Sequence, residues 1–279
     1  MTYLVGQAYT ALVSQYQSFI GQLEARWNSA NTRVCVGLDP NPNKFPPHVG
    51  NVLEFCKAIV RATAPFVCAF KPQVAYFSAL GCEDELVELI NWIHENFGGI
   101  PVILDAKRGD IGSTAELYAK EAFERYEADA VTLNPYLGEE SIRPFLEYDR
   151  KGIFLLCRTS NEGSSWLQDY PSKEPIYLRV AEKAADIAKR HNVMLVVGAT
   201  YPEHLIRVRK IVGDMPILVP GIGAQGGDLL ETIEGGGSRL IVNSSRAIIY
   251  AGSSENYEQE AQIAAKDLRD NIEKHIGNL

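Results

Sequence analysis

The chain has 279 residues, of which 46% are hydrophobic, and its formal net charge at pH 7 is −8. This length and apolar content predict one large domain with a full core rather than two smaller domains. No run of Lys and Arg occurs along the chain, so we expect no nucleic-acid partner, and an anionic ligand would have to be held by a few local cations.

The first segment, about residues 1–30, is predicted to be a helical extension of the domain. It has no basic stretch at its start, and Gln, Ser and Gly interrupt its apolar residues, as in an amphipathic helix. We therefore expect no signal peptide and no membrane span. The five cysteines include no CxxC pair, and three of them lie in apolar runs. This usage is typical of buried free thiols in a reducing cytosol and predicts a cytoplasmic protein.

Eight short apolar runs follow, separated by stretches with apolar residues at three- and four-residue spacing, for example 113–125 and 176–190. Continuous apolar runs of this kind are typical of strands buried on both faces. An open doubly wound sheet and a closed barrel both fit the alternation, but eight regular units in about 250 residues favour a single-domain (β/α)8 TIM barrel over residues 1–279. The predicted strands are 33–38, 66–70, 101–104, 130–133, 152–157, 193–197, 216–219 and 239–242.

Charged residues end the first three runs, where the active site of a barrel lies. Asp39 follows the first run, Lys71 the second, and Asp105, Lys107 and Asp110 the third. Asp105 and Lys107 are two residues apart, so they point to the same side of an extended strand end, and the carboxylate keeps the lysine protonated. One such pair would be read as an ordinary structural ion pair. Charges at three successive strand ends are costly to bury, and this favours a functional site.

A Gly-rich turn at 221–227 follows the seventh run, and Arg246 follows the eighth. This is the usual position of a phosphate site in such barrels. Glycines let backbone N–H groups approach an oxyanion, and an arginine can hold a phosphate by two parallel hydrogen bonds. Such a turn alone can be purely conformational. Its pairing with Arg246 favours a phosphate site.

Several motifs together resemble the orotidine 5′-phosphate decarboxylase family, in its longer variant. Their order and spacing agree over nearly the whole chain. The resemblance implies a carboxy-lyase that converts orotidine 5′-monophosphate to UMP and CO2 in de novo pyrimidine biosynthesis, without a metal or cofactor. The motifs are VGLDP at 36–40, FKPQ at 70–73, DAKRGDIGST at 105–114, NPYLG at 134–138, CRTSN at 157–161, PGIGAQGGD at 220–228 and NSSRAI at 243–248.

The same resemblance implies catalytic roles for the charged residues. Lys107 would donate the proton to the C6 carbanion, and Asp105 would lie beside the carboxylate that leaves. Asp39 and Lys71 would hold the ribose hydroxyls, and Lys71 would extend the charge array. Asp110 would come from the neighbouring subunit, so the resemblance implies a homodimer with sites completed across the interface.

The remaining implied residues bind the substrate. Ile111 and Thr114 would accompany Asp110 across the interface, and Gln225 and Arg246 would bind the phosphate. Ser160 would contact the base, although a hydroxyl at a strand end can equally satisfy a local backbone group. Pro220 completes the implied substrate contacts.

Some alternatives stay open at this stage. A related metal-assisted sugar-phosphate decarboxylase would use carboxylates at these strand ends to hold Mg²⁺, and a nucleotide-sensing barrel would keep the pocket without turnover. The five histidines have no paired ligand spacing, so we predict no metal site. The polar stretch at 161–170 could close part of the site or anchor an insertion through its two aromatics.

Overall fold

The computed structural model describes residues 18–222 and 228–278, which form a closed barrel of parallel strands. Neighbouring strands follow the order β2-β1-β8-β7-β6-β5-β4-β3. Isolated parallel bridges from Phe70 to Val102 and from Gln73 to Asp105 join β2 to β3 and complete the ring. The predicted TIM barrel is confirmed. The strands are β1 Val34–Leu38, β2 Ala69–Pro72, β3 Ile103–Arg108, β4 Ala130–Leu133, β5 Gly152–Arg158, β6 Val193–Val197, β7 Ile217–Pro220 and β8 Leu240–Ser244.

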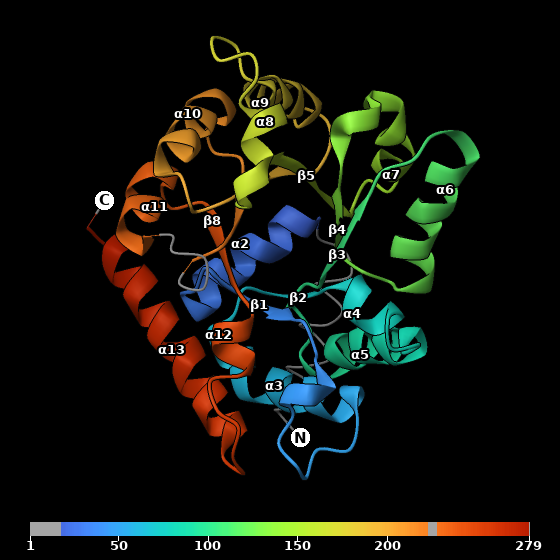
Figure 1. Cartoon of the computed structure of the whole chain (residues 1–279), viewed down its shortest axis with the longest axis vertical. Helices are drawn as coiled ribbons and strands as arrows, with labels where there is room; N and C mark the ends of the chain where they lie inside the picture. The colour runs from blue at the N-terminus through green and yellow to red at the C-terminus, as the bar shows by residue number, and fades with distance from the viewer. Residues whose placement is uncertain (1–17, 223–227, 279) are drawn as a thin grey trace.

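Helices surround the ring of strands (Figure 1). They turn apolar residues inward, as in α5, where Leu86, Leu89, Ile90 and Ile93 are buried at helical spacing. The longer helices are α3 Val52–Thr63, α5 Glu83–Asn96, α6 Gly112–Lys120, α9 Ile176–Ile187, α10 Pro202–Val212, α11 Leu229–Gly236 and α13 Tyr257–Ile276. The short helices are α4 Val74–Ser78, α7 Arg143–Leu146, α8 Ser165–Gln168 and α12 Arg246–Ile249, with a π-helix, η3, at Glu121–Arg125. The 3₁₀ turns are η1 Pro42–Lys44, η2 Ala64–Phe66, η4 Pro135–Leu137, η5 Glu139–Ser141 and η6 Glu162–Ser164.

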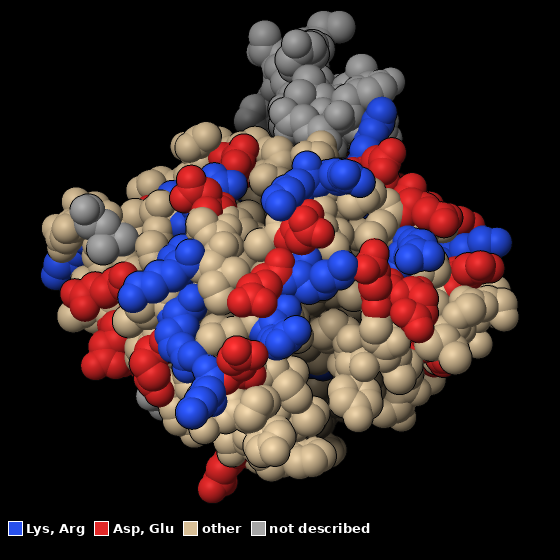
Figure 2. All heavy atoms as spheres, turned by 90° about the horizontal axis from the view of Figure 1, so that it is seen from above, with Lys and Arg blue, Asp and Glu red and all other residues tan. Residues whose placement is uncertain are grey.

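The surface carries both signs of charge. On the face drawn in Figure 2, Lys and Arg side chains are interspersed with Asp and Glu. Among the described residues, no helix is long and apolar enough to cross a membrane. The cysteines are free, and four of them, Cys35, Cys56, Cys68 and Cys157, are buried, where desolvation raises the pKa of each thiol.

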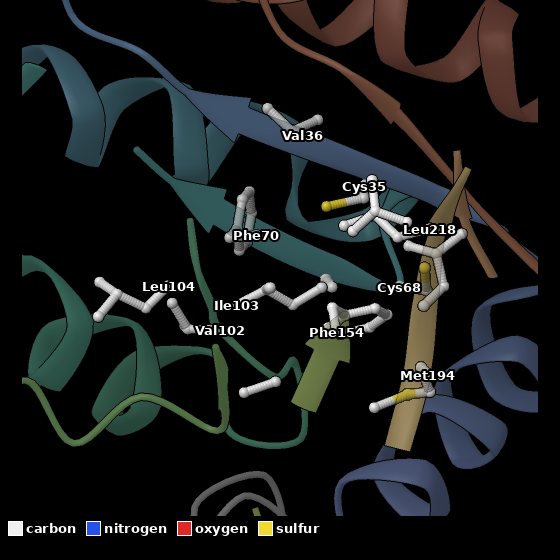
Figure 3. Packing of buried hydrophobic residues seen from close by; sticks show 14 of the residues in the cluster. Cys35, Val36, Cys68, Phe70, Val102, Ile103, Leu104, Phe154, Met194 and Leu218 are labelled. Atoms are coloured by element: carbon white, nitrogen blue, oxygen red, sulfur yellow. The ribbon is translucent and has the colours of Figure 1, made fainter. Parts of the chain in front are cut away.

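The inside of the barrel is filled by side chains. Figure 3 shows Cys35, Ile103, Phe154, Met194 and Leu218 lying close together between strands that are far apart in the sequence. Each of these side chains is at most 2% exposed. The ring therefore encloses a packed core, and any ligand must bind at one of its ends.

Helix α2, Phe19–Ala30, lies across the amino-terminal end of the ring, as seen through the centre of Figure 1. Its buried Phe19 ring meets Phe154 edge to face at 5.6 Å. A Cβ on Gly152, the first residue of β5, would lie 2.5 Å from a Phe19 ring atom, so only glycine allows this contact. Helix α2 occupies the described part of the predicted helical extension, and residues 1–17 lie outside the described residues.

Several predicted strand ends are wrong, and two of them matter for the site. The second and third predicted strands stop at residues 70 and 104, but β2 runs to Pro72 and β3 to Arg108. Lys71 and Asp105 therefore lie within the strands and not after them. The predicted strands stop too early because an apolar pattern ends at the first charged residue. Opposite charges that neutralise each other can nevertheless be buried inside a strand.

Candidate active site

Two adjoining cavities lie at the carboxyl ends of the strands and share Lys71, Asp105 and Pro220. The larger has a volume of about 450 Å³ and the smaller about 180 Å³. The larger is also lined by Lys107, Thr132, Leu156, Thr159, Ser160, Asn161, Gln168, Val196 and Leu218. The smaller is also lined by Asp39, Gly221, Ile222, Asn243, Ser244, Ser245 and Arg246.

Two ammonium groups hold one buried carboxylate at the junction of the cavities. Lys71 Nζ lies 2.8 Å from Asp105 Oδ2, and Lys107 Nζ lies 2.6 Å from Asp105 Oδ1. Burial by itself raises the pKa of Asp105, but the charges of Lys71 and Lys107 outweigh it, and the net pKa lies well below the usual range. Burial lowers the pKa of Lys71, but the charges of Asp105 and Asp39 shift it above its usual value. The Lys71–Asp105 pair therefore stays charged at neutral pH.

Thr132 of β4 fixes the geometry of this cluster. Its Oγ1 donates to Asp105 Oδ1 at 2.9 Å and accepts the N–H groups of Ala106 at 3.0 Å and Lys107 at 2.9 Å. Lys107 has a φ of +47°, in the left-handed region that a side chain of this size rarely adopts. The register between β3 and β4 also shifts between Leu104 and Arg108. This irregularity turns the Lys107 side chain, which is 47% exposed, toward Asp105 and the cavity.

The smaller cavity contains buried acceptors that have no partner among the described residues. They are the Oδ1 atoms of Asp39 and Asn243. Asn243 is 7% exposed. Close packing also surrounds this cavity, because a Cβ on Gly37 would lie 1.8 Å from Ser245 Oγ, so glycine is needed where β1 passes the end of β8. A buried polar atom without a partner favours a ligand that brings a donor. Arg246, the first residue of α12, adds a cation to this cavity.

The predicted base contact Ser160 and the predicted contact Pro220 both line the larger cavity. Gly198 approaches Ser160 so closely that an added Cβ would lie 2.7 Å from the serine Cβ. Thr200 Oγ1 donates to the Ser160 carbonyl oxygen at 3.4 Å. The predicted phosphate contact Gln225 lies outside the described residues.

Three predicted residues do not reach either cavity within one chain. Asp110, Ile111 and Thr114 lie in the turn after β3 and at the start of α6, and none of them lines the cavities. Asp110 Oδ1 accepts the N–H of Ile111 at 2.8 Å, and Ile111 is 56% exposed. The structure thus brings together Asp39, Lys71, Asp105 and Lys107, while Asp110 lies apart from them.

Sequence reasoning missed several residues that line the cavities, among them Thr132, Asn243 and Gln168. Thr132 is a lone hydroxyl in an apolar run, which is the signal that could have found it. Asn243 directly follows the eighth apolar run, while Gln168 lies in a polar stretch without any periodic pattern. Within the described residues no group of three or more metal-ligating side chains occurs.

Comparison with known proteins identifies the family. The family model described as orotidine 5′-phosphate decarboxylase / HUMPS matches residues 32–261. The chain belongs to this family. The resemblance read from the motifs is confirmed, and the match spans all eight strands.

Individual members of the family are similar over most of their length. The orotidine 5′-phosphate decarboxylase of Dechloromonas aromatica is 56% identical over 265 residues, covering 91% of this chain and 98% of the relative. That of Ralstonia pickettii is 52% identical over 264 residues, covering 91% and 97%. The solved structure of Leishmania donovani OMP decarboxylase is 36% identical, with a TM-score of 0.81, and covers 94% of this chain and 100% of that one.

Proposed function

We propose that the chain converts orotidine 5′-monophosphate to UMP and CO2 at the cavity lined by Lys71, Asp105 and Lys107. This is the activity of a carboxy-lyase in pyrimidine biosynthesis. The family and relatives of 50–56% identity carry the name orotidine 5′-phosphate decarboxylase. The observation that carries the proposal is a buried carboxylate held by two ammonium groups beside a cavity.

The chemistry follows from this cluster. When CO2 leaves, the electron pair of the broken bond stays at C6 of the pyrimidine ring. The Lys107 ammonium stabilises this charge and then gives its proton to C6, and the neutral amine takes up a proton from water. Asp105 disfavours the nearby substrate carboxylate electrostatically and holds Lys107 by the 2.6 Å contact.

The rest of the site binds the nucleotide. Asp39 and Lys71 hold the ribose hydroxyls, and the unpartnered Asp39 Oδ1 supports this role. Arg246 and Gln225 bind the phosphate, with Pro220 between the two cavities and Ser160 at the base. Binding energy from the remote phosphate orders the site around the reacting carbon.

The site is completed by a second copy of the chain in this proposal, with Asp110, Ile111 and Thr114 supplied by the partner. Large apolar side chains near these residues support an interface, since Ile111, Leu117 and Tyr136 are 56%, 64% and 74% exposed. Gly109 approaches Asn134, which places the start of η4 beside the turn that carries Asp110.

Mixing two inactive variants tests the shared site. Asp110→Ala and Lys107→Ala homodimers should both be inactive. A mixed dimer should contain one intact site, so random mixing should restore about a quarter of the parent activity. Lack of any recovery, with mixed dimers demonstrated by mass, would show that Asp110 acts within its own subunit.

The activity itself is tested by incubating the purified chain with orotidine 5′-monophosphate and measuring CO2 and UMP. Turnover should continue in the presence of a chelator, whereas a metal-assisted sugar-phosphate decarboxylase would stop. UMP binding without turnover would instead identify a nucleotide-sensing barrel.

We also infer a cytoplasmic location and a single domain over residues 1–279. The buried free thiols support a reducing compartment. The barrel strands and α2 share one hydrophobic core, which supports a single folding unit.

A further inference from the structure

The polar stretch at 161–170, which follows β5 and is called the insertion below, borders the larger cavity through α8. Four of the cavity residues belong to the insertion or directly precede it. These are Thr159, Ser160, Asn161 and Gln168. They carry hydroxyl and carboxamide groups without formal charge. The charged side chains of the same cavity, Lys71, Asp105 and Lys107, come from β2 and β3. The wall of the cavity is therefore divided by chemistry between different strands.

A buried arginine holds the insertion in place. Arg158, the last residue of β5, is 2% exposed and donates to both oxygens of Asp169, at 2.9 and 3.0 Å. Its Nη1 donates to the Thr159 carbonyl oxygen at 2.6 Å and to Ser164 Oγ. Its guanidinium carbon lies 5.1 Å from the centre of the Tyr201 ring. Two parallel hydrogen bonds and a ring contact restrict the orientation of the Arg158 guanidinium, and this fixes the position of Asp169 and of the residue before it relative to β5.

That preceding residue is Gln168, and its carboxamide has a fixed orientation. Its Oε1 accepts the main-chain N–H of Thr159 at 2.8 Å, and its Nε2 donates to Thr159 Oγ1 at 2.9 Å. Because a main-chain N–H can only donate, oxygen must face it. Thr159 Oγ1 then donates to Asn161 Oδ1 at 2.6 Å. The hydrogen bonds run in one direction, from Gln168 through Thr159 to Asn161.

This network leaves hydrogen-bonding capacity unused at the cavity. A carboxamide has two N–H donors and two acceptor lone pairs. Gln168 uses one N–H on Thr159 Oγ1, and its Oε1 accepts the Thr159 N–H at 2.8 Å and also lies 3.3 Å from Thr159 Oγ1. Asn161 accepts through Oδ1 from Thr159. The second N–H of Gln168 therefore stays available to a ligand in the cavity that it lines.

The base of the substrate matches this wall. A pyrimidine-2,4-dione has an imide edge, in which an N–H lies between two carbonyl oxygens, on the side of the ring opposite C6. When C6 faces Lys107, the imide edge points away from the charged cluster and requires neutral donors and acceptors. The remaining N–H of Gln168 is a neutral donor that suits a carbonyl oxygen of this edge.

We propose that Gln168 is a specificity-determining residue that hydrogen-bonds the imide edge of the pyrimidine base, and that the Arg158–Asp169 pair positions it. The inference rests on the proposed decarboxylase function. It assigns the insertion to the substrate site and predicts that Gln168 contributes to binding only when the ligand carries a base.

The test compares a ligand that has the base with one that lacks it. We would measure Kd for UMP and for ribose 5-phosphate, by calorimetry, in the parent and in Gln168→Met, which keeps the length of the side chain but removes its donors and its amide acceptor. The Kd for UMP should rise about tenfold, as expected for a lost hydrogen bond at a polar ligand edge. The Kd for ribose 5-phosphate should change less than about twofold.

A second variant guards against a folding defect. Gln168→Glu retains the acceptor for the Thr159 N–H but replaces the donors by a charged carboxylate, so it should also raise the ratio of the Kd for UMP to the Kd for ribose 5-phosphate. Trp166→Ala, in the same short helix with a side chain 79% exposed, is the matched control and should leave both constants unchanged.

The outcomes separate this inference from the function on which it rests. A parent protein that neither turns over orotidine 5′-monophosphate nor prefers UMP to ribose 5-phosphate would overturn the decarboxylase proposal. An active parent whose Gln168 variants keep the parental ratio would overturn only the role of Gln168. Equal weakening of both ligands would also overturn it, because the insertion would then support the whole site without reading the base.

Discussion

The two ends of the barrel each bury a carboxylate beside a cavity, yet they differ in what that carboxylate can do. At the carboxyl end, Asp105 is held by Lys71 and Lys107. At the amino end, Asp129, just before β4, accepts from the Val102 N–H at 2.8 Å and lies 2.8 Å from His94 Nε2. Burial alone raises the pKa of Asp129, but the hydrogen bond and charge of His94 shift it below its usual value, so both carboxylates are anionic at neutral pH.

The amino end has the larger cavity, of about 650 Å³, against about 450 Å³ at the carboxyl end. Asp129, however, spends its hydrogen bonds on holding the start of β3 and helix α5 together. Lys107 retains ammonium donors on the cavity side, and Asp39 and Asn243 present acceptors without partners among the described residues. Donors and acceptors that face a cavity without a protein partner therefore distinguish the carboxyl end as the candidate active site. The volume of the cavity and the lowered pKa of a buried carboxylate do not distinguish the two ends in this way.

The largest effect should come from removing the ammonium group at the carboxyl end. Lys107→Ala should lower kcat for orotidine 5′-monophosphate by at least about 10³-fold, since proton donation and charge stabilisation are both lost. Lys151→Ala, which removes an ammonium 3.8 Å from Asp129, is the matched control and should retain the parental kcat. Equal losses in both variants would abolish the distinction between the two ends.

Arg246→Ala should have the next largest effect, with kcat/KM reduced about 10- to 100-fold because a charged contact to the phosphate is removed. We expect KM to rise and kcat to fall, since the remote contact also helps to order the reacting ring. Steady-state kinetics with varied substrate would show the split. Parental values of both constants would remove Arg246 from the phosphate site.

Thr132→Val should lower kcat about tenfold while leaving the ammonium and carboxylate groups in place. The substitution deletes the hydroxyl that accepts two N–H groups of β3 and donates to Asp105, so Lys107 loses its fixed geometry. Thr132→Ser should restore most of the rate because it keeps the hydroxyl. If valine and serine behave alike, the hydroxyl does not position Lys107.

The smallest effect on catalysis is expected at the amino end. Asp129→Asn should keep the parental kcat and lower the free energy of unfolding at pH 7 by about 1–3 kcal/mol, because a hydrogen-bonded charge is replaced. The pKa of Asp129 is lower in the folded than in the unfolded chain, so its contribution is present above about pH 4 and is lost as the pH falls through the folded value. Urea unfolding at pH 7 and pH 3 should therefore show the parent and variant converging in acid.

Much of the fold is predictable because burial on both faces of a parallel strand gives continuous apolar runs. The alternation of these runs with amphipathic helices led to the barrel, and the barrel placed Asp39, Lys71, Asp105 and Lys107 at one end. The same reasoning made the predicted second and third strands too short, because it ends a strand at the first charged residue. A sequence pattern does not show that Lys71 and Asp105 neutralise each other across neighbouring strands.

The missing parts of the site depend on contacts between segments that sequence spacing does not relate. Gln168 reaches the cavity only because Arg158 and Asp169 fold the insertion back onto β5. Thr132 acts across the β3–β4 pair through its hydroxyl, and hydroxyls are common in strands for other reasons. Asp110 lies outside the cavities of its own chain, so no argument from one chain can place it.

The Lys71–Asp105 pair also lies at the seam of the cylinder. Strands β2 and β3 are joined by the isolated bridges from Phe70 to Val102 and from Gln73 to Asp105, whereas the other neighbouring strands form ladders, with register shifts in β3–β4 and β5–β6. The Lys71–Asp105 ion pair therefore links two strands that are otherwise joined by isolated bridges, and in the proposed function the same two side chains line the substrate site. A substitution of Lys71 or Asp105 is therefore expected to weaken the junction of β2 and β3 as well as to change the chemistry of the cavity.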